Sequence, residues 1–143
     1  MLKNRVIVAS TLLLGALFGL SALAQEKSTA PADAVTYIVS PADGAVVTSP
    51  VTVIFGLDGM GVAPAGINVE NTGHHHLIID APLPDLDLPV PADDHYRHFG
   101  KGQTQVTVAL DAGEHTLQLL LGDWLHIPHD KVVASEPITI TVQ

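Results

Sequence analysis

Residues 51–57 read VTVIFGL, and this stretch decides the fold class. Its alternate residues are apolar and share one face: Val51, Val53, Phe55 and Leu57. A period of two is typical of a β-strand with one buried face, because successive side chains point to opposite sides. Residues 104–110 (TQVTVAL) repeat the alternation. The inner faces of two such strands are therefore expected to build a core.

Six blocks of this kind follow one another, separated by Gly, Pro, Asn and Asp, and no helical period interrupts them. They cover residues 34–40, 51–57, 74–80, 104–110, 115–121 and 136–142, with a short extra strand around 45–47. Residues 81–94 contain four prolines, which suits an extended surface connection or a weak edge. The opening SPADGAVVTSPVTVIFGL (40–57) resembles the first two strands of many bacterial immunoglobulin-like domains. We therefore predict an all-β fold, an immunoglobulin-like antiparallel β-sandwich of six to seven strands over residues 34–143.

The N-terminus has the pattern of a cleavable export signal. Lys3 and Arg5 precede an apolar run over residues 6–20, and Ala22-Leu23-Ala24 follows. The run is short for a membrane span, which needs about 20 residues, so no span is expected in the mature chain. We predict a signal peptide over residues 1–24, a disordered lead-in over 25–33 and a location in the periplasm.

Charge and cysteine content exclude several classes of function. The whole chain has a formal net charge of −9, and both basic residues of the signal would be lost on cleavage. The mature chain would then carry about −11, which disfavours nucleic acid as a partner. Because the chain has no cysteine, it can form neither a disulfide nor a thiolate metal site. Nitrogen, oxygen or thioether atoms would have to hold any metal ion.

The chain has eight histidines, and seven of them fall into three short clusters. These are His74 to His76, then His95 and His98, then His126 and His129. In the predicted sandwich, the connections that carry the three clusters emerge at one end, so the clusters are expected to converge. His115 would lie at the opposite end, and we interpret it as structural.

Strand alternation also predicts on which face of the strand each histidine of the first cluster lies. If Leu77 and Ile79 face the core, His75 shares their side, while His74 and His76 point to the opposite face. The reverse register would turn Asp80 inward, which costs free energy unless that carboxylate is paired. We therefore expect His74 and His76 to form a chelating pair.

Four blocks carry a family resemblance: GMGVAPAG (59–66), NTGHHHLIID (71–80), HYRHFGKGQT (95–104) and HTLQLLLGDWLHIPHD (115–130). In this order and spacing they resemble the bacterial domain of unknown function family 4399, from Thr36 to the C-terminus. That family is uncharacterised and typically exported. The resemblance implies a fold and a location, and it brings no assigned function.

The leading hypothesis is a periplasmic domain that binds a transition metal ion, most plausibly copper, with zinc as the alternative. Imidazole suits both ions, and a thioether would help to hold Cu(I). The first candidate ligands are His74, His76, His126 and His129, and the secondary ones are His95, His98 and Met60. Asp80, Asp94 or Asp130 could orient imidazoles through hydrogen bonds.

Two other classes of function stay open. The same end could bind another periplasmic protein or a glycan through Trp124, Tyr96 and Phe99, with the histidines as a hydrogen-bonded scaffold. An enzyme has the least support, since the chain lacks a G-x-S-x-G elbow, an H-E-x-x-H motif and a phosphate-binding glycine loop. A metal ion held by three histidines could still activate water, by analogy with metalloenzymes of sandwich fold.

Overall fold

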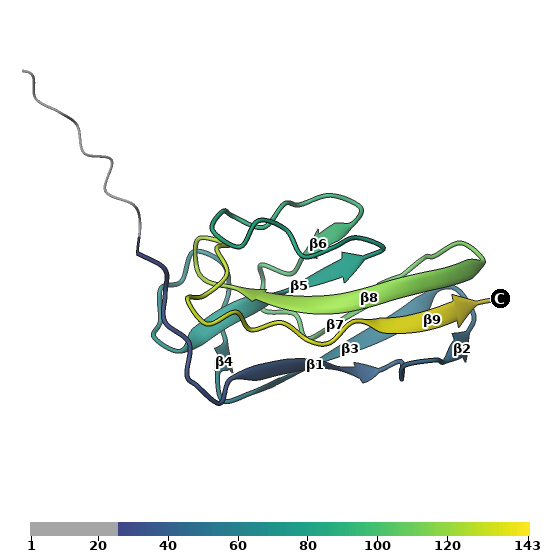
Figure 1. Ribbon diagram of the computed structural model, residues 1–143, viewed down its shortest axis with the longest axis horizontal. Helices are drawn as coiled ribbons and strands as arrows, with labels where there is room; N and C mark the ends of the chain where they lie inside the picture. The colour runs from purple at the N-terminus through teal and green to yellow at the C-terminus, as the bar shows by residue number, and fades with distance from the viewer. Residues whose placement is uncertain (1–25) are drawn as a thin grey trace, which may run out of the picture.

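Two β-sheets stack face to face in this protein (Figure 1). The computed structural model describes residues 26–143, and the predicted signal peptide lies outside them. Nine strands make up the sheets: β1 Val35–Ser40, β2 Val46–Val47, β3 Val51–Asp58, β4 Gly61–Val62, β5 Thr72–Ile79, β6 Tyr96–His98, β7 Gln105–Val108, β8 Gly113–Gly122 and β9 Ile138–Val142. Within the described residues, no helix is long and apolar enough to cross a membrane.

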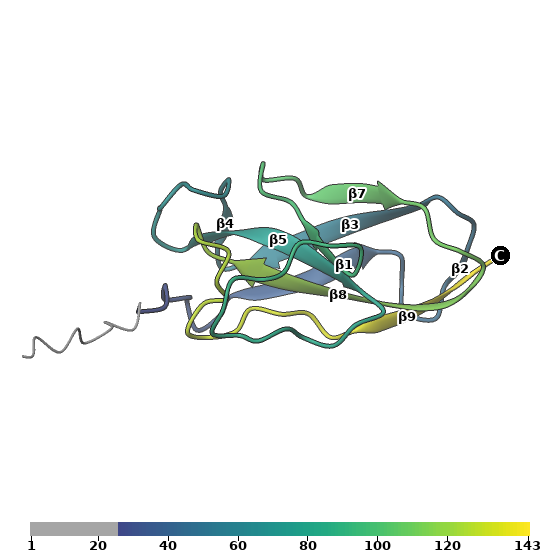
Figure 2. The same ribbon diagram turned by 90° about the horizontal axis from the view of Figure 1, so that it is seen from above.

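The smaller sheet has the order β1-β3-β7, and the larger has the order β2-β9-β8-β5-β4, with β6 paired to the edge of β5. The view of Figure 2 shows β1 and β3 crossing the strands of the other layer. The prediction of an all-β sandwich is thus confirmed. Two short strands depart from the antiparallel expectation, because β2 pairs in parallel with β9 and β4 pairs in parallel with β5. The strands β4 and β6 lie outside the six predicted blocks and the short extra strand.

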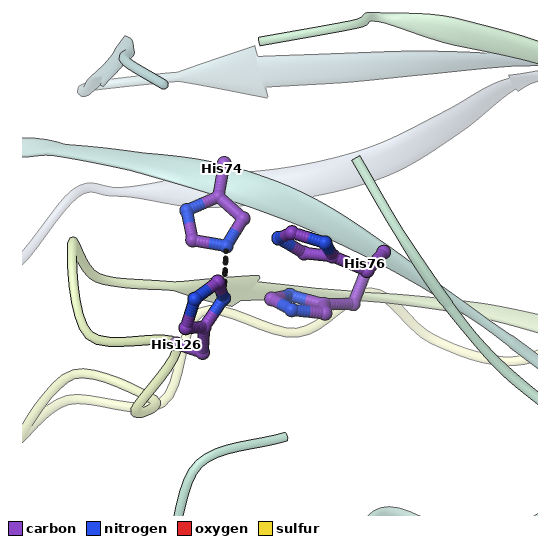
Figure 3. Close-up of side chains that lie close together, drawn as sticks. His74, His76 and His126 are labelled. Carbon is purple, nitrogen blue, oxygen red and sulfur yellow. Dashed lines mark hydrogen bonds between the residues drawn. The ribbon is translucent and has the colours of Figure 1, made fainter. Parts of the chain in front are cut away.

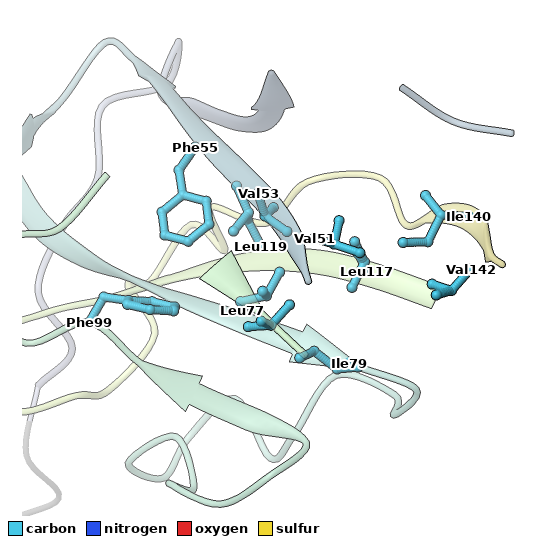
Figure 4. Close-up of a cluster of buried hydrophobic side chains, with 11 residues drawn as sticks. Val51, Val53, Phe55, Leu77, Ile79, Phe99, Leu117, Leu119, Ile140 and Val142 are labelled. Carbon is cyan, nitrogen blue, oxygen red and sulfur yellow. The ribbon is translucent and has the colours of Figure 1, made fainter. Parts of the chain in front are cut away.

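Apolar side chains from both sheets meet between the layers (Figure 4). Val53 of β3 faces Leu77 of β5 and Leu119 of β8, and none of the three is exposed to solvent. Full burial of one such side chain is worth about 1.5–3 kcal/mol. The alternation in residues 51–57 therefore has the predicted consequence, since Val51 and Phe55 join the same core.

The register of β5 fixes where the first histidine cluster points. Leu77 and Ile79 lie in the core, and His75 shares their side, with its ring centroid 5.2 Å from that of Phe55. His74 and His76 therefore project from the opposite face, as predicted.

The outer face of β5 is nevertheless buried, because the proline-rich connection lies across it. Val90 of that connection packs against Ile78 of β5 and Leu120 of β8. His74 and His76 are also 0% exposed although they point away from the main core, and their rings contact those of His98 and His126. This connection gives the larger sheet a second, smaller hydrophobic layer.

The segment before β1 is held against the loop between β8 and β9. Ser28 Oγ donates a hydrogen bond of 2.6 Å to Asp123 Oδ2, and the Ser28 carbonyl accepts one from the amide of Asp130. The Lys131 ammonium donates to the carbonyls of Ala32 and Ala34. Within the lead-in expected over residues 25–33, residues from Ser28 onward are thus tied to this loop.

His115 lies near the start of β8, at the end of the sheet far from His74, His76, His98 and His126. Its Nδ1 is 2.6 Å from Asp80 Oδ2, and its Nε2 is 2.9 Å from the carbonyl oxygen of Asp111. Both partners are acceptors, so both ring nitrogens donate only in the imidazolium form. The hydrogen bond to Asp80, followed by that to Asp111, raises the pKa of His115 above its ordinary value. The structural role predicted for this histidine fits these contacts.

Replacing His115 by Gln is expected to destabilise the protein by about 1 kcal/mol near pH 5, since a charge-assisted bond to a partly exposed carboxylate is lost. The folded-state pKa is raised, so the stabilisation is complete below the unfolded-state pKa of 6.5 and is lost as pH rises through the folded-state pKa. Urea unfolding of wild type and His115→Gln at pH 5 and pH 8.5 measures the difference. An equal loss at the two pH values would contradict the ion pair.

Candidate metal centre

Four imidazoles from three separate segments meet at one end of the larger sheet. His74 and His76 come from β5, His98 from β6, and His126 from the loop between β8 and β9. One nitrogen from each ring can be chosen so that all four atoms lie within 4.8 Å of one another. Figure 3 shows the rings of His74 and His76 on β5 turned toward His126. We refer to these four residues as the histidine cluster.

The two ligand candidates on β5 are placed by strand geometry. His74 pairs with Gly122 of β8, and His76 pairs with Leu120. A Cβ atom at position 122 would lie 2.8 Å from Cε1 of His76 and 3.3 Å from the backbone of His126. A glycine at the end of β8 therefore makes the space in which the His76 ring and the His126 loop approach each other.

His98 joins the cluster because of its register on β6. This strand runs antiparallel to β5, so that His98 stands opposite His76 and Tyr96 stands opposite Ile78. The ring centroids of His98 and His76 are 5.2 Å apart. A Cβ atom at Gly100 would lie 2.3 Å from Cε1 of His98, so a glycine two residues later also leaves room for this ring.

The loop that carries His126 is shaped by a buried carboxylate. Asp123, 4% exposed, accepts hydrogen bonds at Oδ1 from the amides of Leu125 and Ile127. His126 itself has a φ of 68°, a left-handed conformation that is uncommon outside glycine. Its amide donates to the Asp123 carbonyl, and its carbonyl accepts from the amide of Val90. Such an unfavourable conformation persists where surrounding contacts impose it, often at functional sites.

The polar atoms of the cluster are poorly satisfied within the protein. His74 Nε2 and His126 Nδ1 are 3.1 Å apart, so one of the two rings must donate a proton to the other. His74 Nδ1 and both ring nitrogens of His76 are buried and have no hydrogen-bond partner. Leaving a buried polar group unpaired costs about 1–3 kcal/mol, and native proteins rarely accept this without a reason.

Burial and mutual repulsion favour the neutral form of three rings, those of His74, His76 and His98. Burial is the main cause that lowers the pKa of His74 to about 4, and the neighbouring His98 and His126 lower it further. Burial likewise lowers the pKa of His76 to about 3, with added repulsion from His74. The pKa of His98 is also lowered, by burial and by His126. Neutral imidazole is the form that binds a metal ion, so these three rings can offer lone pairs at neutral pH.

The dimensions of the cluster are close to those of a single-ion site. Imidazole nitrogens bind zinc at about 2.0–2.1 Å, so two ligands of one ion are at most about 4.2 Å apart. The 4.8 Å limit on the four nitrogens is only slightly wider. The cluster could therefore hold one metal ion after small side-chain movements.

Three of the seven ligand candidates lie outside this group. His129 is 1% exposed, and its Nε2 donates to the Thr72 carbonyl over 3.1 Å. His95 lies at the far end of β5, where its Nδ1 donates to the Ile79 carbonyl. Met60 packs with Leu121 in a small apolar cluster. The structure thus brings together His74, His76 and His126 of the predicted set and adds the secondary candidate His98.

The carboxylates expected to orient the imidazoles make other contacts. Asp80 binds His115, Asp94 lies 3.6 Å from Arg97, and Asp130 accepts the amides of Ala30 and Lys131. Asp123 fixes the backbone on either side of His126 instead. The sequence does contain one signal for the role of Asp123, namely its position beside the third histidine cluster.

The aromatic residues of the alternative hypothesis do not form one surface. Phe99 is buried in the main core, and its ring centroid is 5.0 Å from that of Phe55. Tyr96 packs against the outer layer and donates its hydroxyl to the Pro82 carbonyl. Trp124 is half-buried and lines a pocket with Ile67 and Val69 at the cluster end. A binding face built from all three aromatic residues is therefore not supported.

Comparisons with known proteins give a family without a function. No curated protein matches the chain, and no solved structure matches it. One family description matches over residues 53–143, which include all four members of the histidine cluster. That match covers more than half of the chain and bears out the resemblance seen in the four sequence blocks. The chain belongs to the DUF4399 family, a domain of unknown function.

Proposed function

We propose that this protein binds a single transition metal ion through the histidine cluster. The observation that carries the proposal is the convergence of four imidazoles, two of them fully buried, with ring nitrogens that have no partner in the protein. A metal ion would accept the lone pairs of these rings together. The cost of burying unpaired imidazoles would then be offset when the ion binds.

Copper(II) is the ion that the ligand set favours most, with zinc(II) as the alternative. Four neutral nitrogen ligands suit both ions, and among the divalent ions of the first row affinity is highest for Cu(II). Because Met60 and the cluster belong to different parts of the fold, the thioether argument for Cu(I) falls away. Calcium and magnesium are disfavoured, since both prefer oxygen ligands.

The periplasm is the compartment we propose for this activity. The export signal predicted for residues 1–24 supports it. We propose a role in holding or passing on the ion. A catalytic role has no support beyond the ligand set itself.

Titration of the untagged mature chain with Cu(II) and Zn(II), against a chelator of known affinity, tests the proposal. One ion per chain is expected to bind with a dissociation constant below micromolar. Replacing both His74 and His126 by Ala is expected to weaken binding at least 100-fold, because two of the four ligands are removed.

The matched control is His95→Gln, which changes a histidine of the second sequence cluster that lies outside the histidine cluster. It is expected to keep wild-type affinity. Binding that is micromolar or weaker, or that is equally strong in the His74→Ala, His126→Ala double variant, would contradict the proposed function.

A further inference from the structure

The four members of the histidine cluster differ sharply in burial. His74 and His76 are 0% exposed, His126 is half-buried, and His98 is exposed. An ion held by all four would thus have protein on the side of β5 and solvent on the side of His98. Of the four candidate ligands, His98 is the most open to solvent, His126 is partly open, and His74 and His76 are closed off.

The backbone that carries His98 is fixed, while its side chain is exposed. The next residue, Phe99, is 6% exposed in the core, and its amide donates to the His75 carbonyl. The Gly100 carbonyl accepts a hydrogen bond from the amide of Ala65. The His98 ring itself contacts the rings of His74, His76 and His126, with centroid distances of 4.6–5.2 Å.

The other three rings are held more firmly. The rings of His74 and His76 are fully buried, and the His126 ring is hydrogen-bonded to His74 on a loop fixed by Asp123. Rotation of an exposed side chain takes place in picoseconds to nanoseconds, whereas a buried ring cannot turn without displacing its neighbours.

We infer that His98 is the exchangeable ligand of this site, through which the ion is loaded and released. The inference rests on the proposed function. His74, His76 and His126 would retain the ion, while a single nitrogen donor of imidazole size, arriving from solvent, takes the position of His98. In this exchange one metal–nitrogen bond breaks as another forms, and neither the charge nor the oxidation state of the ion changes.

The exchange accounts for features that a closed structural site would not need. Structural zinc sites have four fixed ligands, whereas sites that react keep one position open to an outside ligand. Here the fourth ligand is on a strand of three residues at the edge of a sheet, and a glycine makes room for its ring. An exposed nitrogen donor at this position can leave without unfolding any part of the protein.

Cu(II) affinity and the visible absorption of the Cu(II) complex test the inference in wild type, His98→Ala, His76→Ala and His126→Ala. We expect His98→Ala to bind about tenfold more weakly and the other two variants at least 100-fold more weakly. Millimolar imidazole is expected to raise the Cu(II) affinity of His98→Ala back toward that of wild type. It should also restore the absorption of the wild-type complex.

The outcomes separate the two hypotheses. A wild-type chain that binds no ion would overturn the proposed function and this inference with it. If wild type binds but His98→Ala loses as much affinity as His126→Ala, or imidazole fails to restore it, only the exchange role of His98 is refuted. His126→Ala serves as the second reference because His126 is half-buried in a loop, so its loss should not prevent folding even if His76→Ala does.

Discussion

Saturation of the histidine cluster with Cu(II) is expected to raise the midpoint of thermal unfolding by about 15 °C. An ion present at 1,000 times its dissociation constant stabilises the folded state by about 4 kcal/mol. For a domain of this size, 1 kcal/mol corresponds to a shift of roughly 4 °C. Weak binding of copper to histidines of the unfolded chain would reduce the shift. Calorimetry with and without one equivalent of Cu(II) measures it.

The His74→Ala, His126→Ala double variant is the informative control for this experiment. It keeps six of the eight histidines, so nonspecific binding to the unfolded chain should be almost unchanged. The midpoint of this variant is expected to shift by only a few degrees. A shift as large as that of wild type would place the ion elsewhere in the protein.

The fold could be predicted because it depends on local patterns. The alternation in residues 51–57 specified one buried face, and Val53 is 0% exposed in β3. The same rule placed His75 toward the core and His74 and His76 on the other face. The two-residue strand β4 carries too little pattern to be recognised, since it depends on contacts with β5.

Which histidines join the histidine cluster depends on strand register, and sequence spacing alone does not give the register. His95 and His98 are three residues apart, yet the antiparallel pairing of β6 with β5 places His98 opposite His76 and His95 beside Ile79. His126 and His129 are likewise three residues apart. The tight turn around Asp123 directs His126 to the cluster, while His129 binds the Thr72 carbonyl.

The residues that make room for the site were also missed. Gly122 and Gly100 appear in the sequence as ordinary turn residues, but added Cβ atoms would collide with the rings of His76 and His98. Their role follows from the approach of side chains from other strands. It becomes visible only when the fold is known.

The metal-free protein is expected to lose most of its stability between pH 6.5 and about pH 4. Burial lowers the pKa of His74, His75 and His76 to about 4, 4 and 3, whereas in the unfolded chain each is near 6.5. Below pH 6.5 the unfolded state therefore binds more protons than the folded state, and stability falls with pH. One such shift corresponds to roughly 3 kcal/mol, a large part of the 5–15 kcal/mol of a typical domain.

His75→Leu separates the core histidine from the histidine cluster in this experiment. Both ring nitrogens of His75 are buried without a partner beside Phe55, so an apolar side chain of similar size removes a protonation site and little else. The variant should unfold at a lower pH than wild type, by roughly one unit, in an acid titration followed by circular dichroism. His115→Gln should not show this gain, because the raised pKa of His115 stabilises the protein in acid. If His75→Leu and wild type unfold at the same pH, protonation of the buried histidines is not what drives acid unfolding.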